Sequence, residues 1–339
     1  MYNLRKIISE AEKRYPLMTT QDFVKLIYQN EFGCGHFVSD KKASLERIKK
    51  EISESYEKNQ IFENIGGGYT RLFLRKNIEN MISAEIINKI FLMSAEKSGS
   101  LESFKEKLKL FWETCLNGDI GLDLEEAKKY LSEYEKQGFP MVSHSEQFRK
   151  AYNPAYRVVK NQFSVYFEVI CAVKKLLDEK NRVVLAIDGR CSSGKSTLAK
   201  VLAELFNGEV VSVDDFFLPF EKRSAERMSE CGGNIDYERL KTEVIDNLRL
   251  ADGFSYGVFS CKSGKIKEKK EISPKSLIIV EGSYCCHEYF GEPYDLKVFL
   301  TVDEKIQKER ILHRNGEKCS ACLKICGFLW RKTILMDKK

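Results

Sequence analysis

Residues 189–196, Gly-Arg-Cys-Ser-Ser-Gly-Lys-Ser, constrain the fold of this chain more than any other segment. They match the pattern GxxxxGK[ST] at every fixed position. An apolar run at 183–188 precedes them and a helical pattern at 196–206 follows. A loop between a strand and a helix is the setting in which this pattern wraps around phosphate groups. The sequence therefore predicts a nucleotide-binding loop, in preference to a glycine-rich turn that matches by chance.

Each residue type in this loop has a physical reason. Gly189 and Gly194 let backbone N–H groups turn toward phosphate oxygens, and Lys195 neutralises the outer phosphates. Ser196 offers its hydroxyl to Mg²⁺, while the helix N-terminus adds its positive dipole end. The predicted phosphate-binding residues are Gly189, Ser192, Ser193, Gly194, Lys195, Ser196 and Thr197.

Around the loop, short β-branched runs alternate with helical patterns. Besides 183–188, such runs occur at 209–215, 276–282 and 295–303. Buried runs that alternate with helices are typical of a parallel sheet with crossover helices. We therefore expect an α/β fold of the P-loop NTPase type, a parallel sheet with flanking helices.

The first part of the chain has a different texture. Helical patterns are expected at 19–30, 43–58, 77–96, 101–116, 124–137 and 161–180, with Thr19 as a candidate N-cap of the first. A length of 339 residues is comfortable for two domains. We expect a mostly helical domain at 1–159, whose role the sequence does not assign, and a P-loop domain at 160–339.

Composition excludes several classes of protein. The 56 Lys+Arg and 50 Asp+Glu residues give a formal charge of +6, which is too mild to indicate a nucleic-acid partner. No apolar run approaches a membrane span, and residues 1–16 contain no stretch of signal-peptide length. We expect a cytoplasmic protein with reduced thiols, no membrane partner and scope for a homo-oligomer.

A candidate catalytic carboxylate follows the second apolar run. The segment Ser-Val-Asp-Asp-Phe-Phe-Leu-Pro at 212–219 places Asp214 at a predicted strand end, and the DxxG and NKxD motifs of GTPases are not found. A carboxylate at the carboxyl end of a parallel strand faces the ligand crevice, where it can accept a proton from a hydroxyl. The alternative is that the paired aspartates only cap the following turn.

The order of five segments now resembles a known family. GxxxxGKST, DDFF, GGNIDYERL, IIVEG and DLKVFLTVDEKIQKERILHRNG occur in the order seen in the uridine kinase and phosphoribulokinase family of P-loop kinases, over about residues 160–316. The resemblance implies an enzyme that uses ATP and Mg²⁺ to phosphorylate a hydroxyl of a small metabolite, such as a nucleoside.

The resemblance also implies roles for individual residues. Asp214 matches the catalytic base, Asp236 an acid that binds sugar hydroxyls, and Glu281 an acid near Mg²⁺. Arg310 and Arg314 match lid arginines that approach the transferring phosphate. Alternatives remain: Asp236 as a helix N-cap, Glu281 as a surface acid, and the arginines as a solvated helix face.

Part of the family pattern is altered here. In a predicted hairpin at 254–272 Tyr256 is kept, but Gly257 replaces an acid, Cys261 replaces a histidine and Lys262 with Ser263 replaces an arginine. Because a site built to bond one substrate rejects analogues, these changes argue against a pyrimidine acceptor.

Two arginines suggest what a different acceptor would carry. Arg223 and Arg227 follow Asp214 closely and either face an anionic acceptor or are exposed charges. The altered hairpin motivates a second hypothesis, a nucleotide-responsive binding protein with a degenerate kinase domain. The residues after Gly316, which depart from the family pattern, motivate it as well.

Other polar residues are weaker candidates. In the first region His36, Arg71, His144, Arg149 and Arg157 either form an anion-holding surface or are structural and surface residues. Near the C-terminus, His313 with Cys319, Cys322 and Cys326 offers zinc ligand types, but the same cysteines would line one helix face as apolar residues, which we favour.

Overall fold

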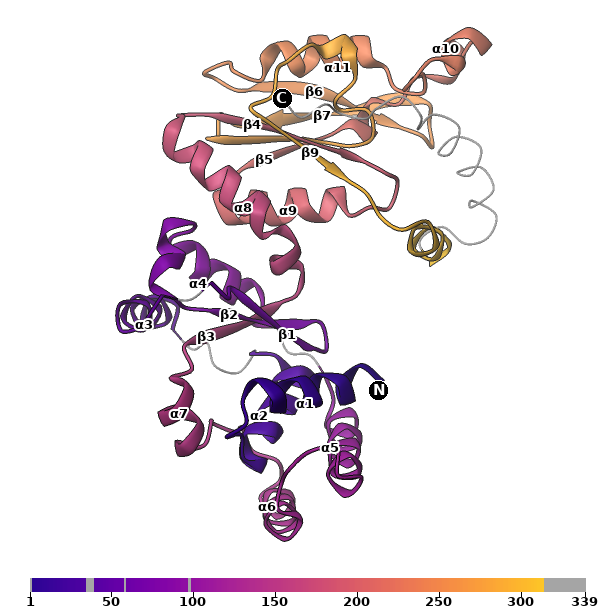
Figure 1. Cartoon of the computed structure of the whole chain (residues 1–339). Coiled ribbons are helices and arrows are strands. Elements are labelled where there is room, and N and C mark those ends of the chain that lie inside the picture. Colours follow the sequence, from indigo (N-terminus) through magenta and orange to yellow (C-terminus); the bar gives the residue numbers. More distant parts are fainter. Residues whose placement is uncertain (1, 35–39, 58, 97–98, 314–339) are drawn as a thin grey trace. The chain divides into compact units, whose positions relative to one another are not determined.

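The computed structural model describes residues 2–34, 40–57, 59–96 and 99–313 (Figure 1). The chain divides into two compact units, residues 1–168 and 169–339, which we describe separately. Helix α8 (Gln162–Glu179) contains this division, and the boundary that we place near residue 160 lies at its start.

The first unit combines helices with a small antiparallel sheet. Its helices are α1 (Tyr2–Arg14), α2 (Thr20–Phe32), α3 (Lys41–Ser53), α4 (Ala84–Met93), α5 (Leu101–Leu116), α6 (Leu124–Lys136) and α7 (Glu146–Tyr152), with a 3-10 helix η1 (Lys76–Asn80). Strands β1 (Phe62–Gly66), β2 (Tyr69–Phe73) and β3 (Tyr156–Lys160) form a sheet in the order β1-β2-β3. The prediction of a mostly helical region is confirmed.

The sheet itself was not predicted from sequence. Strand β2 is buried at every position, so it shows no alternation of apolar and polar residues. The glycines at 66–68 form the turn of the β1–β2 hairpin. Short strands without alternation are not separable from loops by pattern alone.

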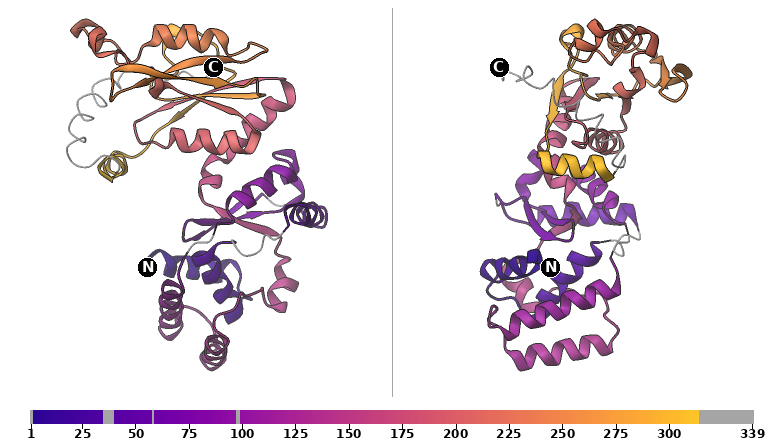
Figure 2. Two further views of the ribbon diagram at one scale, coloured as in Figure 1. Left: turned by 180° about the vertical axis from the view of Figure 1, so that it is seen from behind. Right: turned by 90° about the vertical axis from the view of Figure 1, so that its right-hand side faces the viewer.

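Helix caps and aromatic packing organise this unit. Thr19 is the N-cap of α2, as predicted, and its backbone N–H donates to the Asp22 carboxylate over 3.1 Å. Phe23 of α2 stacks on Phe111 of α5 with ring centres 5.5 Å apart. Figures 1 and 2 show α3 and α4 beside each other and close to β3, and residue contacts agree.

A buried polar network joins α2 to β3 through the segment before α7. Asp22 is fully buried, and its Oδ1 lies 2.9 Å from His144 Nδ1. The other ring nitrogen, His144 Nε2, lies 2.6 Å from the Tyr156 hydroxyl. Ser145 donates its backbone N–H and its hydroxyl to the same aspartate. Each buried group in this chain of contacts therefore has a hydrogen-bonding partner.

The second unit is built on a parallel sheet. Its strands are β4 (Val183–Gly189), β5 (Glu209–Ser212), β8 (Leu277–Glu281) and β9 (Leu296–Leu300), in the order β5-β8-β4-β9 with every pairing parallel. The other elements are α9 (Lys195–Phe206), α10 (Ala225–Ser229), α11 (Tyr237–Glu243), strands β6 (Phe254–Ser260) and β7 (Lys265–Ile272), and 3-10 helices η2 (Val213–Phe216), η3 (Phe220–Lys222), η4 (Ile245–Asn247) and η5 (Glu288–Phe290). This confirms the predicted α/β sheet with flanking helices.

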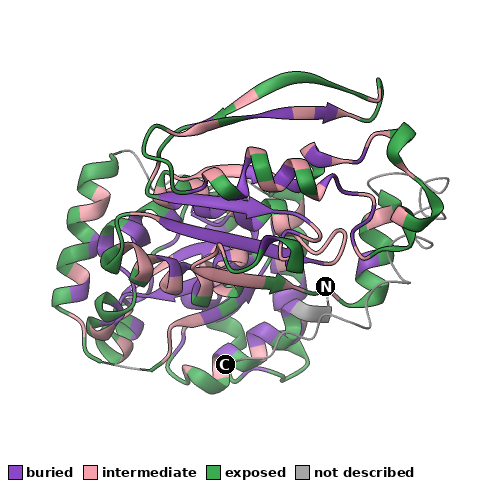
Figure 3. Cartoon of the chain, turned by 90° about the horizontal axis from the view of Figure 1, so that it is seen from above, coloured by how far each residue is buried: buried purple, intermediate pink, exposed green. Residues whose placement is uncertain are grey.

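Layers form on both faces of this sheet. Figure 1 shows α8 and α9 on one side and α11 with the β6–β7 hairpin on the other. Every residue of β4 and β8 is buried, which explains their continuous apolar sequence. The predicted hairpin at 254–272 is present, and most of β7 is exposed along its length (Figure 3).

One strand is shorter than predicted. The sequence indicated a strand over 209–215, but β5 ends at Ser212 and residues 213–216 form η2. The change of backbone geometry places Asp214 and Asp215 in a tight turn beyond the strand end. Among the described residues, no helix is long and apolar enough to cross a membrane.

The buried network predicts a pH dependence of stability. Burial lowers the pKa of His144 to about 4, below its ordinary value of 6.5, although the Asp22 carboxylate opposes this. As the pH falls, His144 takes up a proton in the unfolded chain before it does so in the folded one. The stability that neutral His144 contributes is therefore fully present above pH 6.5 and is lost as the pH falls toward 4. We expect the first unit to be about 2 kcal/mol less stable at pH 5 than at pH 7.5.

Urea unfolding of the wild type and of His144→Gln at both pH values measures this difference. Between pH 7.5 and pH 5 we expect the unfolding free energy of the variant to fall less than that of the wild type, since glutamine does not titrate. An equal loss in both proteins would mean that His144 is not the titrating group.

Candidate active site

The loop after β4 has the backbone that its glycines require. Gly189 has a φ of +138°, and a Cβ placed there would lie 2.0 Å from the Leu300 carbonyl oxygen of β9. Gly194 has a φ of +101° and is the N-cap of α9. Only glycine fits the first position, because both the conformation and the contact exclude a side chain. The loop is therefore held tightly against the neighbouring strand.

Lys195 folds over this loop. Its Nζ donates to the carbonyl oxygens of Gly189 and Arg190, at 3.1 and 3.0 Å, and to the Ser283 hydroxyl at 3.3 Å. Ser283 in turn donates to the Gly189 carbonyl. Ser283 was not a sequence candidate, because a serine two residues after a strand carries no distinctive signal. These contacts hold the ammonium group against the backbone of the loop.

A hydroxyl and carboxylate cluster lies beside it. Ser196 Oγ donates to the Glu281 carboxylate over 3.2 Å, and Ser212 Oγ donates to the same carboxylate over 3.1 Å. The register explains the meeting, since Glu281 pairs with Ile187 on β4 and with Ser212 on β5. Glu281 is 6% exposed. It is therefore an internal carboxylate, and the alternative of a surface acid is wrong for its position.

Burial raises the pKa of the Glu281 carboxyl. The two serine hydroxyls and the Lys195 charge act in the opposite direction, while the nearby Asp214 carboxylate acts with burial. A cation placed among these groups would favour the ionised carboxylate. The cluster therefore has the electrostatic character of a cation-dependent site.

Asp214 lies at the same end of the sheet. It is exposed in η2, directly beyond β5, and close enough to Glu281 to influence its titration. In a parallel sheet the carboxyl ends of the strands share one edge, so residues following β4, β5 and β8 converge. Lys195, Ser196, Glu281 and Asp214 therefore lie at one edge of the sheet.

The other loop residues have distinct surroundings. Ser192 has a positive φ of 57°, and its carbonyl accepts from Arg310 over 3.1 Å. The hydroxyl oxygen of Ser193 is buried without a partner. Thr197 is exposed in the first turn of α9. Arg310 lies in the helical residues 304–313, which also place Gln307 Nε2 2.8 Å from the Cys191 carbonyl. This segment therefore contacts the phosphate loop.

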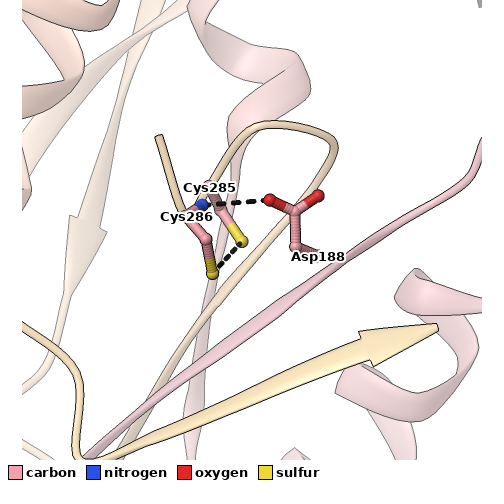
Figure 4. Close-up of side chains that lie close together, drawn as sticks. All are labelled: Asp188, Cys285 and Cys286. Atoms are coloured by element: carbon pink, nitrogen blue, oxygen red, sulfur yellow. Dashed lines mark hydrogen bonds between the residues drawn. The ribbon is translucent and has the colours of Figure 1, made fainter. Parts of the chain in front are cut away.

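Asp188 holds the loop after β4 in place through its carboxylate (Figure 4). Its carboxylate accepts backbone N–H groups from Gly189, Tyr284 and Cys286, at 2.6, 3.1 and 3.1 Å. Sequence reasoning missed this role, although an acid that closes the apolar run at 183–188 is a signal of a buried polar group. The carboxylate ties the loop after β4 to the loop after β8.

Two cysteines beside Asp188 are structural. The Sγ atoms of Cys285 and Cys286 and an Asp188 oxygen lie within 4.8 Å of one another (Figure 4). Burial raises the pKa of the Cys285 thiol well above its ordinary value, and this opposes the thiolate form that metals bind. The carboxylate is already used by backbone N–H groups, so we assign no metal here.

Residues of α11 and β6 contact η2. The Tyr256 hydroxyl donates to Asp215 over 2.8 Å, and Arg239 stacks on Phe216 and donates to the carbonyls of Asp215 and Gly257. Asp236 caps α11 by accepting the Arg239 backbone N–H. The capping alternative is therefore realised, and a role in binding sugar hydroxyls stays a prediction.

The altered family positions fall at two places on the hairpin. Gly257 lies within β6, where a Cβ would lie 2.7 Å from the Ile266 side chain. Cys261 is exposed in the turn after β6.

The arginines after Asp214 are engaged differently. Arg223 donates to the Leu218 carbonyl and lies over the Phe220 ring. Arg227 is held by Glu238 and by the face of Tyr237, with contacts of 2.8 and 3.5 Å. Arg227 is thus occupied within the protein, whereas Arg223 has only a carbonyl partner among the described residues.

In the first unit, the candidate residues are mostly engaged. Arg71 pairs with Glu63, and Arg157 pairs with Glu51 through two hydrogen bonds. His144 belongs to the buried network, while Arg149 is exposed on α7. His36, Arg314, Cys319, Cys322 and Cys326 lie outside the described residues.

Comparison with known proteins places this geometry in context. A Clostridium botulinum uridine kinase is 25% identical over 151 residues, which cover 40% of this chain and 70% of that protein. A Schizosaccharomyces pombe protein provisionally named a uridine kinase is 25% identical over 190 residues, or 48% of this chain and 78% of that protein. A Synechocystis phosphoribulokinase is 23% identical over 130 residues, but only 39% of that protein is covered.

The chain is a distant homologue of the uridine kinase and phosphoribulokinase P-loop kinases over about half its length. No family model matches the chain. A solved Bacillus stearothermophilus structure, provisionally described as a uridine kinase, is 20% identical and covers 50% of this chain with a TM-score of 0.35. That score is too low to support an argument.

The hydrogen bonds of Asp188 predict that its substitution destabilises the second unit. Asp188→Asn replaces one acceptor oxygen by an amide that cannot accept from the backbone N–H groups. We expect a loss of about 2 kcal/mol in the unfolding free energy of the second unit, because hydrogen bonds to a charged group are broken. Urea unfolding followed by circular dichroism measures the change. Asp214→Asn, at an exposed position, is the matched control, and an equal effect of both substitutions would contradict the assignment.

Proposed function

We propose that this kinase homologue is an ATP-dependent phosphotransferase that phosphorylates a hydroxyl of a small metabolite. The observation that carries the proposal is the convergence of Lys195, Ser196, Glu281 and Asp214 at the carboxyl ends of β4, β8 and β5. Phosphoryl transfer needs positioned cations and a base more than covalent chemistry, and this set supplies both. Lys195 and the loop amides would hold the phosphates of ATP.

The Ser196, Glu281 and Ser212 cluster suits Mg²⁺. Hydroxyl and carboxylate oxygens are hard ligands of the kind that this ion binds together with substrate phosphates. Mg²⁺, when bound, supplies charge neutralisation on the transferring phosphate. Ser196 and Glu281 would hold the ion, and Ser212 would orient the carboxylate from behind.

Asp214 would act as the general base. It is exposed in the crevice rather than buried in an ion pair, so an acceptor hydroxyl can approach its carboxylate. Arg310, which contacts the loop at Ser192, would add positive charge near the transferred phosphate. Arg314 would extend this role by its place in the family pattern.

The acceptor is proposed to be neither uridine nor cytidine. Tyr256, which the family keeps, is used here to hold Asp215. The position of the family histidine is the exposed Cys261 in the hairpin turn, and that of the acid is Gly257. A sugar-like or phosphorylated acceptor, bound through Asp236 and Arg223, fits these residues better than a pyrimidine.

The base assignment predicts a separation of binding from transfer. In Asp214→Asn we expect unchanged ATP affinity, since the residue does not contact the loop, and a turnover lower by about 10²–10⁴-fold. Titration with ATP and coupled ADP release measure the two quantities. Asp252→Asn, at an exposed position in the turn before β6, is the matched control, and we expect it to keep wild-type turnover. Wild-type turnover in Asp214→Asn would remove this residue from the mechanism.

A screen of acceptors tests the proposed activity directly. Purified protein with ATP and Mg²⁺ is presented with nucleosides, sugars, sugar phosphates and vitamins, and ADP release is followed. We expect one acceptor class to stimulate release strongly, with the pyrimidine nucleosides inactive. A response to no acceptor, together with measurable ATP binding, would instead support the nucleotide-responsive binding protein.

A further inference from the structure

Arg75 is an unusually placed cation in the first unit. It lies two residues after the end of β2 and is 4% exposed. Its guanidinium lies 4.8 Å from the centre of the Phe73 ring and 4.7 Å from that of Tyr56. Two aromatic rings therefore position the group and exclude water from its faces.

The same guanidinium has unused hydrogen-bond donors. Its Nε and one terminal nitrogen are buried without a partner, and within the described residues no carboxylate forms an ion pair with it. A buried guanidinium without a partner is costly, and a ligand that accepts hydrogen bonds from it recovers part of that cost. The contacts with aromatic rings satisfy no N–H donor.

A cavity lies beside Arg75. Its volume is about 40 Å³, and its walls include Tyr15, Tyr56, Arg71, Phe73, Arg75 and Tyr156. That volume holds roughly three water-sized groups, or one carboxylate or phosphoryl group. Tyr56 is 46% exposed, so this wall borders solvent.

The charge around the cavity favours an anion. Glu63 is the carboxylate here, and it already accepts from Arg14, Arg71 and the Tyr15 hydroxyl, at 3.0, 3.1 and 3.3 Å. The Nε and the second terminal nitrogen of Arg71 donate to the Gln29 side-chain oxygen. Arg14 and Arg71 thus share the Glu63 carboxylate, and Arg75 has no ion pair among the described residues.

We propose that the first unit is a binding domain for a small oxyanion, with Arg75 as the anchoring residue. The ligand carries a carboxylate or a phosphoryl group, which accepts hydrogen bonds from the guanidinium of Arg75. The inference concerns the first unit alone and is independent of the kinase proposal.

Phosphate and acetate are the test probes. The full chain carrying Lys195→Met is used, because the phosphate loop would otherwise bind phosphate as well. Thermal unfolding and calorimetric titration compare sodium phosphate and sodium acetate with sodium chloride at equal ionic strength and pH 7.5. We expect a saturable rise in melting temperature with at least one oxyanion, because a ligand of the folded state stabilises it.

Arg75→Gln is the decisive variant. We expect it to weaken oxyanion binding at least tenfold, while Arg5→Gln, which alters an exposed ion pair with Glu113, leaves binding unchanged. If Arg75→Gln does not fold, Tyr56→Ala removes one ring at an exposed position and is expected to weaken binding at least threefold.

The two oxyanions also distinguish the chemical group. Tighter binding of phosphate indicates a phosphoryl ligand, and tighter binding of acetate indicates a carboxylate. The proposal is overturned if neither oxyanion exceeds chloride, as expected for a cavity that holds only water. It is also overturned if saturable binding persists unchanged in Arg75→Gln and Tyr56→Ala.

Discussion

The candidate active site depends on one buried carboxylate. Asp188 accepts backbone N–H groups from the loop after β4 and from the loop after β8, which carry the phosphate-binding residues and the chain beyond Glu281. The Ser283 hydroxyl adds a second connection, since it accepts from Lys195 and donates to the Gly189 carbonyl. The Gly189 backbone, pressed against the Leu300 carbonyl, adds contact with β9. These contacts fix the backbone of the loop after β4, whereas Asp214 lies at an exposed position beyond β5.

Buried charge is treated differently in the two units. Around the phosphate loop, the buried acids Asp188 and Glu281 are satisfied by N–H and hydroxyl donors. In the first unit Asp22 is satisfied in the same way, and Arg71 has its own carboxylate. Arg75 departs from this rule among the described residues, since two of its nitrogens are buried without a hydrogen-bonding partner and the residue lines a cavity. The lack of a partner, and not the mere presence of an arginine, makes Arg75 a candidate binding residue.

Local pattern predicted much of the kinase half. The phosphate loop, the parallel sheet and the hairpin were all readable because buried strands, glycines and alternating helices leave strong local signals. The small sheet of the first unit was not, since β2 is buried on both faces and β3 is separated from it by more than 80 residues of chain. Pairings between distant segments depend on long-range packing, which a pattern within one window does not contain. The same limit hid Ser212, Ser283 and Asp188.

The sequence by itself determined the chemistry of the phosphate loop. GxxxxGKS specifies a backbone conformation and a lysine whose roles follow from residue type alone. Tertiary structure decided which other residues act with it. Glu281 and Ser212 meet because β5 and β8 pair in register, and Asp236 caps a helix although its motif also suggests a substrate contact. Tertiary structure likewise left Arg75 between two rings and without a carboxylate. Local sequence specifies what a side chain can do, but the partners that it finds depend on segments brought together only by folding.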